Sequence, residues 1–133
     1  MEELLEKLYK EFEIDKILSF NEFDVQEKLE SNAYRIMQFH DLMLKEEKDI
    51  EEIVEKRDSY VGDLYDKLRF HHDESLTKVE IEKYYIPRDE KLKKINKIIR
   101  IRETRRRFFE AVCKALDKQG WNMRTFSDNL KRT

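Results

Sequence analysis

Glycine and proline are almost missing from this chain, which contains 2 Gly and 1 Pro among its 133 residues. Both residues interrupt helices and form turns, so their scarcity predicts long helices joined by few turns. Phosphate-binding loops need closely spaced glycines so that the backbone can approach the ligand, but Gly62 and Gly120 stand far apart. The sequence therefore argues against a nucleotide-hydrolysing site.

Cysteine and long apolar runs are also scarce. Cys113 is the only cysteine and falls among apolar residues at helical spacing, which predicts a buried structural thiol and excludes a disulfide within the chain. The first residues, Met1-Glu2-Glu3, lack the apolar region of a signal peptide, and no apolar run approaches the length of a membrane span. We expect a soluble protein of a reducing compartment.

Residues that hold metals or perform catalysis form no pattern that would support either role. His71, His72 and Asp73 are consecutive, and consecutive helical residues do not face one another, so we expect a solvated polar segment instead of a metal site. His40 falls in the stripe of a predicted helix, where a packed polar residue is expected. We therefore expect no catalytic residue, no metal and no cofactor.

Charge is abundant and unevenly distributed. Charged residues make up 44% of the chain and the mean hydropathy is -0.89, so the apolar supply is small for a compact monomer. Residues 1–87 carry 13 Lys and Arg against 24 Asp and Glu, whereas residues 88–133 carry 15 against 6. Two interpretations stay open: the two parts neutralise one another between subunits, or the basic part binds a polyanion.

The apolar pattern predicts an all-α fold with two long amphipathic helices and several short ones. A short helix is expected at residues 3–12, and Asp24 with Glu27 has the spacing of a capping box that opens a helix running to about Phe70. One heptad position of this helix holds Leu29, Ile36, Met43, Ile50, Arg57 and Leu64. The position four residues later holds Ala33, His40, Glu47, Val54, Val61 and Leu68. Such a stripe needs partner helices, from the same chain and from neighbouring chains.

A connector is predicted at residues 71–87. Thr77 and Glu80 form a second capping box that opens a short helix, and Ile86 is expected outside helical geometry because Pro87 follows it. A long basic helix comes next, and Gly120 has the expected place of a left-handed residue that closes it. We interpret the chain as one helical domain, with acidic helices in 1–70, the connector in 71–87, and the basic helix with a C-terminal oligomerisation segment in 88–133.

Basic residues supply the remaining functional signal. Cations beside aromatic residues suit single-stranded nucleic acid, because bases stack on the rings while the cations meet phosphates. A face that is merely solvated, or paired with acidic residues, explains the same pattern equally well. The candidate nucleic-acid-contacting residues are Lys56, Arg57, Lys67, Arg69, Lys93, Lys97 and Arg100.

The end of the basic helix is apolar and aromatic. Burying one large apolar side chain contributes about 1.5–3 kcal/mol, so this segment is expected to hold subunits together. The candidate oligomerisation residues are Phe108, Phe109, Val112, Leu116, Trp121 and Phe126.

Three segments carry a family resemblance. They are L-Y-D-K-L at residues 64–68, T-K-V-E-I-E-K-Y-Y-I-P-R-D-E at residues 77–90, and F-F-E-A-V-C-K-A-L-D-K-Q-G-W-N-M-R-T-F at residues 108–126. In order and spacing the chain resembles the UvsY family of phage recombination mediators from about Asp24 to Leu130. The strongest part is A-L-D-K-Q-G-W-N-M-R, in which Gly120 and Trp121 match a glycine-aromatic corner of the family.

The resemblance implies an all-α, ring-like homo-oligomer, a hexamer or heptamer, that binds single-stranded DNA and has no enzymatic activity. Such a protein helps load the phage recombinase, UvsX, in place of the phage single-stranded-DNA-binding protein, in the cytoplasm of the infected bacterial host cell. The family's Lys-x-Arg pair near the end of its long N-terminal helix has its nearest match in Lys67-x-Arg69. The alternative hypothesis is a coiled-coil structural or adaptor protein without nucleic-acid binding.

Overall fold

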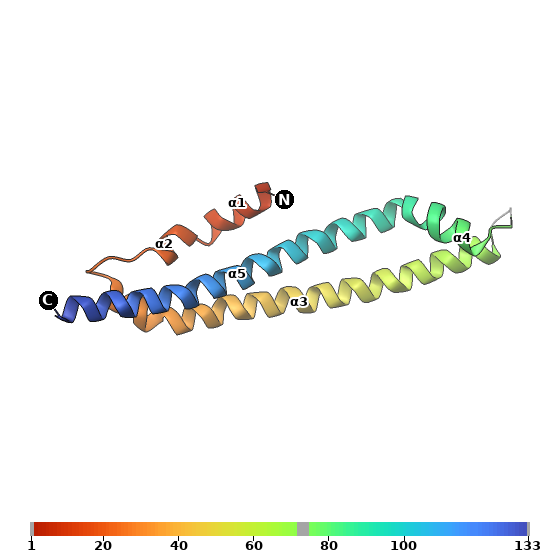
Figure 1. The fold of residues 1–133 in the computed structure, drawn as a ribbon. Helices are drawn as coiled ribbons and strands as arrows, with labels where there is room; N and C mark the ends of the chain where they lie inside the picture. Colours follow the sequence, from red (N-terminus) through yellow and green to blue (C-terminus); the bar gives the residue numbers. More distant parts are fainter. Residues whose placement is uncertain (1, 72–74, 133) are drawn as a thin grey trace. The chain divides into compact units, whose positions relative to one another are not determined.

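The computed structural model describes residues 2–71 and 75–132, and these residues form helices and connecting turns without any β-strand. Figure 1 shows the two long helices, α3 and α5. Shorter helices precede α3 and connect α3 to α5 along the chain. The elements in chain order are α1 (Glu2–Glu11), α2 (Ile14–Leu18), α3 (Val25–Phe70), α4 (Lys78–Glu80), the π-helix η1 (Ile81–Tyr85), the 3-10 helix η2 (Ile86–Arg88) and α5 (Glu90–Arg132). The predicted all-α fold with two long helices is confirmed.

The chain divides into two compact units, each built around part of α3 and part of α5. Unit 1 combines Met1–Glu46 with Thr104–Thr133, and unit 2 is Glu47–Glu103. Hydrogen-bonded or ion-paired residues of α3 and α5 in unit 1 include Asn32–Leu116, Ile36–Cys113 and Glu46–Arg105. In unit 2 the pairs joining α3 to α5 or to its capping residue include Asp49–Arg102, Arg57–Asn96 and Tyr60–Asp89. One partner's number rises as the other falls, so the two helices pack antiparallel within each unit.

Unit 1 contains an aromatic core that α1 and α2 help to close. Its buried cluster consists of Ile14, Phe39, Phe109, Val112 and Leu116. The Phe12 ring, which follows α1, meets the rings of Phe39 and Phe109 edge-on at centroid distances of 5.6 and 5.4 Å. Edge-to-face contacts of this kind add to the burial of apolar area, so the N-terminal helices are held by the core that they cover.

The start of α3 is capped three residues earlier than the sequence pattern predicts. The Asn21 side chain accepts hydrogen bonds from the backbone N–H groups of Phe23 and Asp24, and Asp24 Oδ1 accepts one from the Asn21 N–H at 2.8 Å. The Asn21 carbonyl already accepts the Val25 N–H at 3.0 Å, so helical turns begin there. The predicted box of Asp24 with Glu27 is therefore wrong in register: Asp24 is the second member of a box whose first member is Asn21.

In the first half of α3 the buried stripe differs by one residue from the predicted one, whereas further along the predicted residues Val54, Val61 and Leu68 are half-buried. The residues at the first predicted heptad position are half-buried throughout. Their buried companions lie three residues later, not four: Phe39 and Glu46 are each 5% exposed, whereas His40 and Glu47 are exposed. The companion position is made up of Asn32, Phe39, Glu46, Ile53 and Tyr60. Polar Asn32 and Glu46 on this stripe hide it from a search for apolar spacing.

Gly120 does not end a helix. It lies inside α5, which continues to Arg132, and no glycine in the described residues has a positive φ angle. A Cβ atom at Gly120 would lie 2.7 Å from Asn32 Nδ2, which donates a hydrogen bond to the Leu116 carbonyl. The glycine is explained by this close approach of α3, so the prediction of a C-terminal cap is wrong.

The connector confirms one prediction and corrects another. Thr77 and Glu80 form the predicted capping box, with both reciprocal hydrogen bonds present. Ile86, however, is helical, because Pro87 falls in the first turn of η2, where a missing N–H is tolerated. The break comes at Asp89, whose ψ angle is 122°. His72 and Asp73 of the predicted polar segment lie outside the described residues.

Candidate nucleic-acid interface

Two groups stand out among the cations of α5, and the first group is paired with acidic residues of α3. In unit 1, Arg105 Nε donates to Glu46 Oε1 at 2.7 Å. In unit 2, Arg102 Nη1 lies 3.7 Å from Asp49 Oδ2. Each pair joins α5 to α3. Part of the basic helix is therefore neutralised by the acidic part of the same chain.

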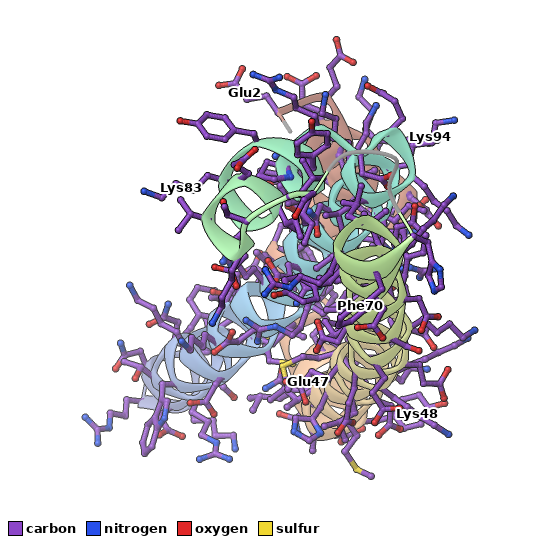
Figure 2. All side chains as sticks on the ribbon, turned by 90° about the vertical axis from the view of Figure 1, so that its right-hand side faces the viewer. Glu2, Glu47, Lys48, Phe70, Lys83 and Lys94 are labelled. Carbon is purple, nitrogen blue, oxygen red and sulfur yellow. The ribbon has the colours of Figure 1, made fainter. Side chains whose placement is uncertain are left out.

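The second group forms an exposed surface on the first third of α5. We call it the basic face; it consists of Lys91, Lys93, Lys94, Lys97 and Arg100, all exposed. Lys93 Nζ lies 3.3 Å from Glu90 Oε1, while Lys94 and Lys97 make no ion pair with any residue in 2–71 or 75–132. Figure 2 shows Lys94 projecting away from the ribbon. An exposed set of cations on adjacent helical turns is suited to contact a chain of phosphates.

The α3 candidates lie in different surroundings from one another. Lys56 and Lys67 are exposed and are separated by 11 residues along one helix, a rise of about 16 Å. Arg57 is half-buried, and its Nη1 donates to Asn96 Oδ1 on α5 at 3.5 Å. Arg69 is exposed, and its Nη1 donates to the Leu76 carbonyl at 3.5 Å. Arg57 thus helps to join the two helices, whereas the lysines leave their ammonium groups to solvent.

Asp89 fixes the point at which α5, and with it the basic face, begins. Its Oδ2 accepts the Leu92 N–H at 2.9 Å, as an N-cap does, and the Tyr60 hydroxyl at 2.7 Å. The hydrogen bond from Tyr60 and those from the backbone lower the pKa of Asp89 below its ordinary value. The same contact raises the pKa of Tyr60, because its neutral form donates the bond. Lys91 Nζ sits 4.8 Å from the centroid of the Tyr60 ring, so the first cation of the face is also positioned by α3.

An aromatic pocket lies beside this helix start, and sequence reasoning missed it. Tyr84, Tyr85, Arg88 and Asp89 line a hollow of about 410 Å³. Tyr84 is 53% exposed and Tyr85 38% exposed, and the Arg88 guanidinium lies 5.9 Å from the Tyr84 ring centroid. The signal in the sequence was the run Y-Y-I-P-R, which we interpreted only as the end of a short helix. Its π-helical turn is of a kind that frequently accompanies functional sites.

The predicted oligomerisation residues fall into two classes. Phe109, Val112 and Leu116 are buried in the core of unit 1, where residues of their own chain already cover them. Phe108 and Phe126 are half-buried, and Phe126 meets the Phe20 ring edge-on at 5.2 Å. Trp121 is 65% exposed, with the Arg124 guanidinium 5.5 Å from its ring centroid. Of the six, Trp121 offers the most surface to another subunit.

Cys113 packs against the core of unit 1 and is half-buried, whereas the sequence predicted a buried thiol. Its thiol is half-buried and donates to the Ile36 carbonyl with an Sγ–O distance of 3.7 Å. Burial raises the pKa of this thiol, and nearby Glu110 adds to the effect. A thiol that resists ionisation is a poor nucleophile at neutral pH.

Metal-binding clusters and membrane spans are both absent from the described residues. Between residues 2 and 71 and between 75 and 132, no group of three or more His, Cys, Asp or Glu is arranged to hold a metal ion. No helix in that part of the chain has the length and apolarity needed to cross a membrane.

No protein-family model, curated protein or solved structure matches this chain. The resemblance to the UvsY family therefore stays a prediction.

Proposed function

We propose that this protein is a non-enzymatic, single-stranded-DNA-binding recombination mediator that acts as a ring-like homo-oligomer. The observation that carries the DNA-binding part is the exposed basic face of α5, at the end of which lies a pocket with two exposed tyrosines. Arg102 and Arg105 are engaged by acids of α3, but Lys94 and Lys97 of the face are exposed to solvent. The combination of exposed cations with exposed rings favours a nucleic-acid strand over a purely structural surface.

Affinity in this proposal comes from repetition. Each subunit contributes only a few phosphate contacts, and a strand that meets several subunits at once gains a high effective concentration for each further contact. Release of counterions from the strand supplies the driving force and makes binding weaken with salt. A ring of hexameric or heptameric size, as in the UvsY family, would supply the repetition.

The mediator role draws on the resemblance. The partners are a UvsX-type phage recombinase and the phage single-stranded-DNA-binding protein, in the cytoplasm of the infected bacterial host cell. Holding the strand on an oligomer would disfavour the competing DNA coat and leave room for the recombinase. Lys56, Arg57, Lys67 and Arg69 on α3 stay candidate contacts beside the basic face.

The experiment is a titration of labelled single-stranded and duplex DNA at several salt concentrations with the full chain. The proposal expects the logarithm of the association constant to fall linearly with the logarithm of salt, with single strands preferred. The Lys94→Glu/Lys97→Glu variant should reduce the steepness of this line by about 0.7 for each phosphate that the variant no longer neutralises. The matched control is Lys7→Glu/Lys10→Glu on α1, which changes the net charge equally at exposed positions outside unit 2. Equal weakening in both variants would show that net charge, not the face, governs binding.

A coiled-coil adaptor is the second candidate function. It is favoured by exposed apolar side chains in unit 1, where Tyr34 and Met37 are each 64% exposed and Trp121 65%. A wild-type chain that binds no DNA even at low salt, and yet self-associates, would support the adaptor and contradict the mediator.

A further inference from the structure

The pocket at the start of α5 lies apart from the cations that contact phosphates, and it has a different chemistry. Its walls are Tyr84, Tyr85, Arg88 and Asp89, all in unit 2 with the basic face. The volume of about 410 Å³ falls in the range of roughly 300–1,000 Å³ that is usual for small-ligand sites. Two tyrosines here expose apolar ring area to solvent.

The pocket has one wall held by hydrogen bonds and one cation beside a ring. Asp89 is held by the Tyr60 hydroxyl at 2.7 Å and by the Leu92 N–H at 2.9 Å. Arg88 lies with its guanidinium 5.9 Å from the centroid of the Tyr84 ring, within the range of a cation–π contact. A flat ring and a flat guanidinium next to each other offer two stacking surfaces to one planar ligand.

The positive charge next to the pocket favours a planar ligand that also carries phosphate groups. Directly after the pocket come Lys91, Lys94 and Lys97, and the rise from Asp89 to Lys97 is about 12 Å. A nucleotide strand presents a planar base and, within that distance, the phosphates of its neighbours. In Figure 2, Lys83 and Lys94, which lie on either side of the pocket residues in sequence, extend outward in opposite directions.

We propose that Tyr84 and Arg88 form a stacking platform for one unpaired base of single-stranded DNA, and that this platform makes the basic face prefer single strands over duplexes. This inference rests on the proposed function and deepens it. The bases of a duplex are stacked on each other and cannot enter the pocket, so a duplex would contact the lysines alone. A free nucleotide carries the same base and phosphate groups as a strand. The experiment therefore compares binding of the strand with binding of a free nucleotide.

The test measures binding of labelled single-stranded and duplex DNA to the full chain and to three variants. Tyr84→Leu removes the ring and should weaken single-strand binding by roughly 5- to 150-fold, the cost of removing one base–aromatic stack, and leave duplex binding unchanged. Tyr84→Phe keeps the ring and should bind like the wild type. The matched control is Tyr34→Leu, which removes a tyrosine that is 64% exposed on α3 in unit 1. It should change neither affinity.

A second measurement reports stacking independently of affinity. A fluorescent purine analogue placed in the strand should change its emission on binding to the wild type and to Tyr84→Phe. The change should be absent with Tyr84→Leu at saturating protein. Unlabelled adenosine monophosphate should compete only at nucleotide concentrations far above those of the strand.

The outcomes separate this inference from the function on which it rests. If the wild type binds no single strands at low salt, both are overturned. If the wild type binds and Tyr84→Leu binds equally well with the same emission change, the platform is wrong and the DNA-binding function stands. Equal weakening of single-strand and duplex binding in Tyr84→Leu would make Tyr84 a residue that positions the helix instead of a stacking surface. Competition by adenosine monophosphate at the same nucleotide concentration would assign the pocket to a free nucleotide.

Discussion

Asn32 and Gly120 form a contact in which each residue depends on the other. The amide of Asn32 reaches the Leu116 carbonyl at 3.2 Å only because position 120 carries no side chain, and it would lie 2.7 Å from a Cβ atom there. Glycine inside a helix costs about 0.5–1 kcal/mol of stability relative to alanine. At position 120 this cost is offset by the hydrogen bond that the glycine makes possible.

The prediction is that Gly120→Ala destabilises the protein by about 1 kcal/mol, because displacing the Asn32 amide costs more than the gain in helix propensity. In an Asn32→Ala background the same substitution should stabilise by about 0.5–1 kcal/mol, since no side chain then obstructs the new methyl group. Urea unfolding of the four proteins measures the coupling. Additive effects would show that the amide moves aside at no cost.

Asp89 gives stability a pH dependence that can be derived from its contacts. Its folded pKa is lowered, so its contribution is present above the unfolded value of about 3.9 and is lost as the pH falls through the folded pKa. The folded pKa of Tyr60 is raised, so its contribution is present below about pH 10 and is lost as the pH rises through the folded pKa.

Asp89→Ala should therefore lower the free energy of unfolding by about 1 kcal/mol at pH 7, the usual cost of removing an N-cap. The difference from the wild type should shrink as the pH falls below about 4, because the unfolded wild-type chain then binds a proton at Asp89 more readily than the folded chain does. Tyr60→Phe keeps the cap bond and should be destabilised less. Thermal unfolding across pH 3–8 checks both, and a difference independent of pH would mean that the charge of Asp89 contributes nothing.

At the scale of the elements, α3 and α5 are aligned by a seam that mixes apolar and polar positions. In unit 1 the seam buries Phe39 and Phe109 beside the pair of Glu46 and Arg105. The Glu46 side chain is 6% exposed and that of Arg105 is 29% exposed, so the Glu46 carboxylate is largely desolvated. Removing one partner of such a buried ion pair is costly, because it leaves the other charge buried without a partner. The intact pair contributes little net stability.

Arg105→Leu should destabilise the protein by about 2–3 kcal/mol, somewhat below the usual range for a buried pair because the guanidinium is partly solvated. The double variant Glu46→Leu/Arg105→Leu should recover most of that stability, since both charges are gone and the site is apolar. Urea unfolding gives the coupling energy. A double variant as unstable as the single one would show that the pair specifies the packing of this seam.

At the scale of the whole molecule, some basic residues of α5 are neutralised by acidic residues of the same chain, and others are exposed to solvent. Pairs between α3 and α5 occupy Arg102 and Arg105, while the basic face stays exposed. The core of unit 1 also covers apolar residues that the sequence assigned to subunit contacts, Phe109 among them. Self-association, if it follows the proposal, therefore has to use other apolar surface, such as Trp121.

Trp121→Ser should lower the sedimentation coefficient of the proposed oligomer and leave the helical circular dichroism unchanged, because a side chain that is 65% exposed contributes little to the fold of its own chain. The matched control is Phe23→Ser, which removes an aromatic residue that is 90% exposed in the loop before α3. Sedimentation velocity at several concentrations makes the comparison. A wild-type chain that sediments as a monomer at all concentrations would contradict the oligomer itself.

Local signals in the sequence determined a large part of the structure. The scarcity of glycine and proline indicated long helices, one of which runs through to Phe70. The capping box of Thr77 with Glu80 could be predicted directly, because it depends only on residues within one helical turn. The basic face could also be anticipated, because Lys93, Lys97 and Arg100 share a side of any helix that contains them.

Only the tertiary structure decided which side of α3 is buried, why position 120 is glycine, and which cations of α5 are neutralised. Each of these depends on residues far apart in the chain, such as Asn32 against Leu116 and Glu46 against Arg105. Polar residues that are satisfied by a distant partner look like surface residues until that partner is in place. The pocket of Tyr84 and Arg88 was missed for a related reason: the spacing of aromatic residues gives no sign of whether their rings are covered.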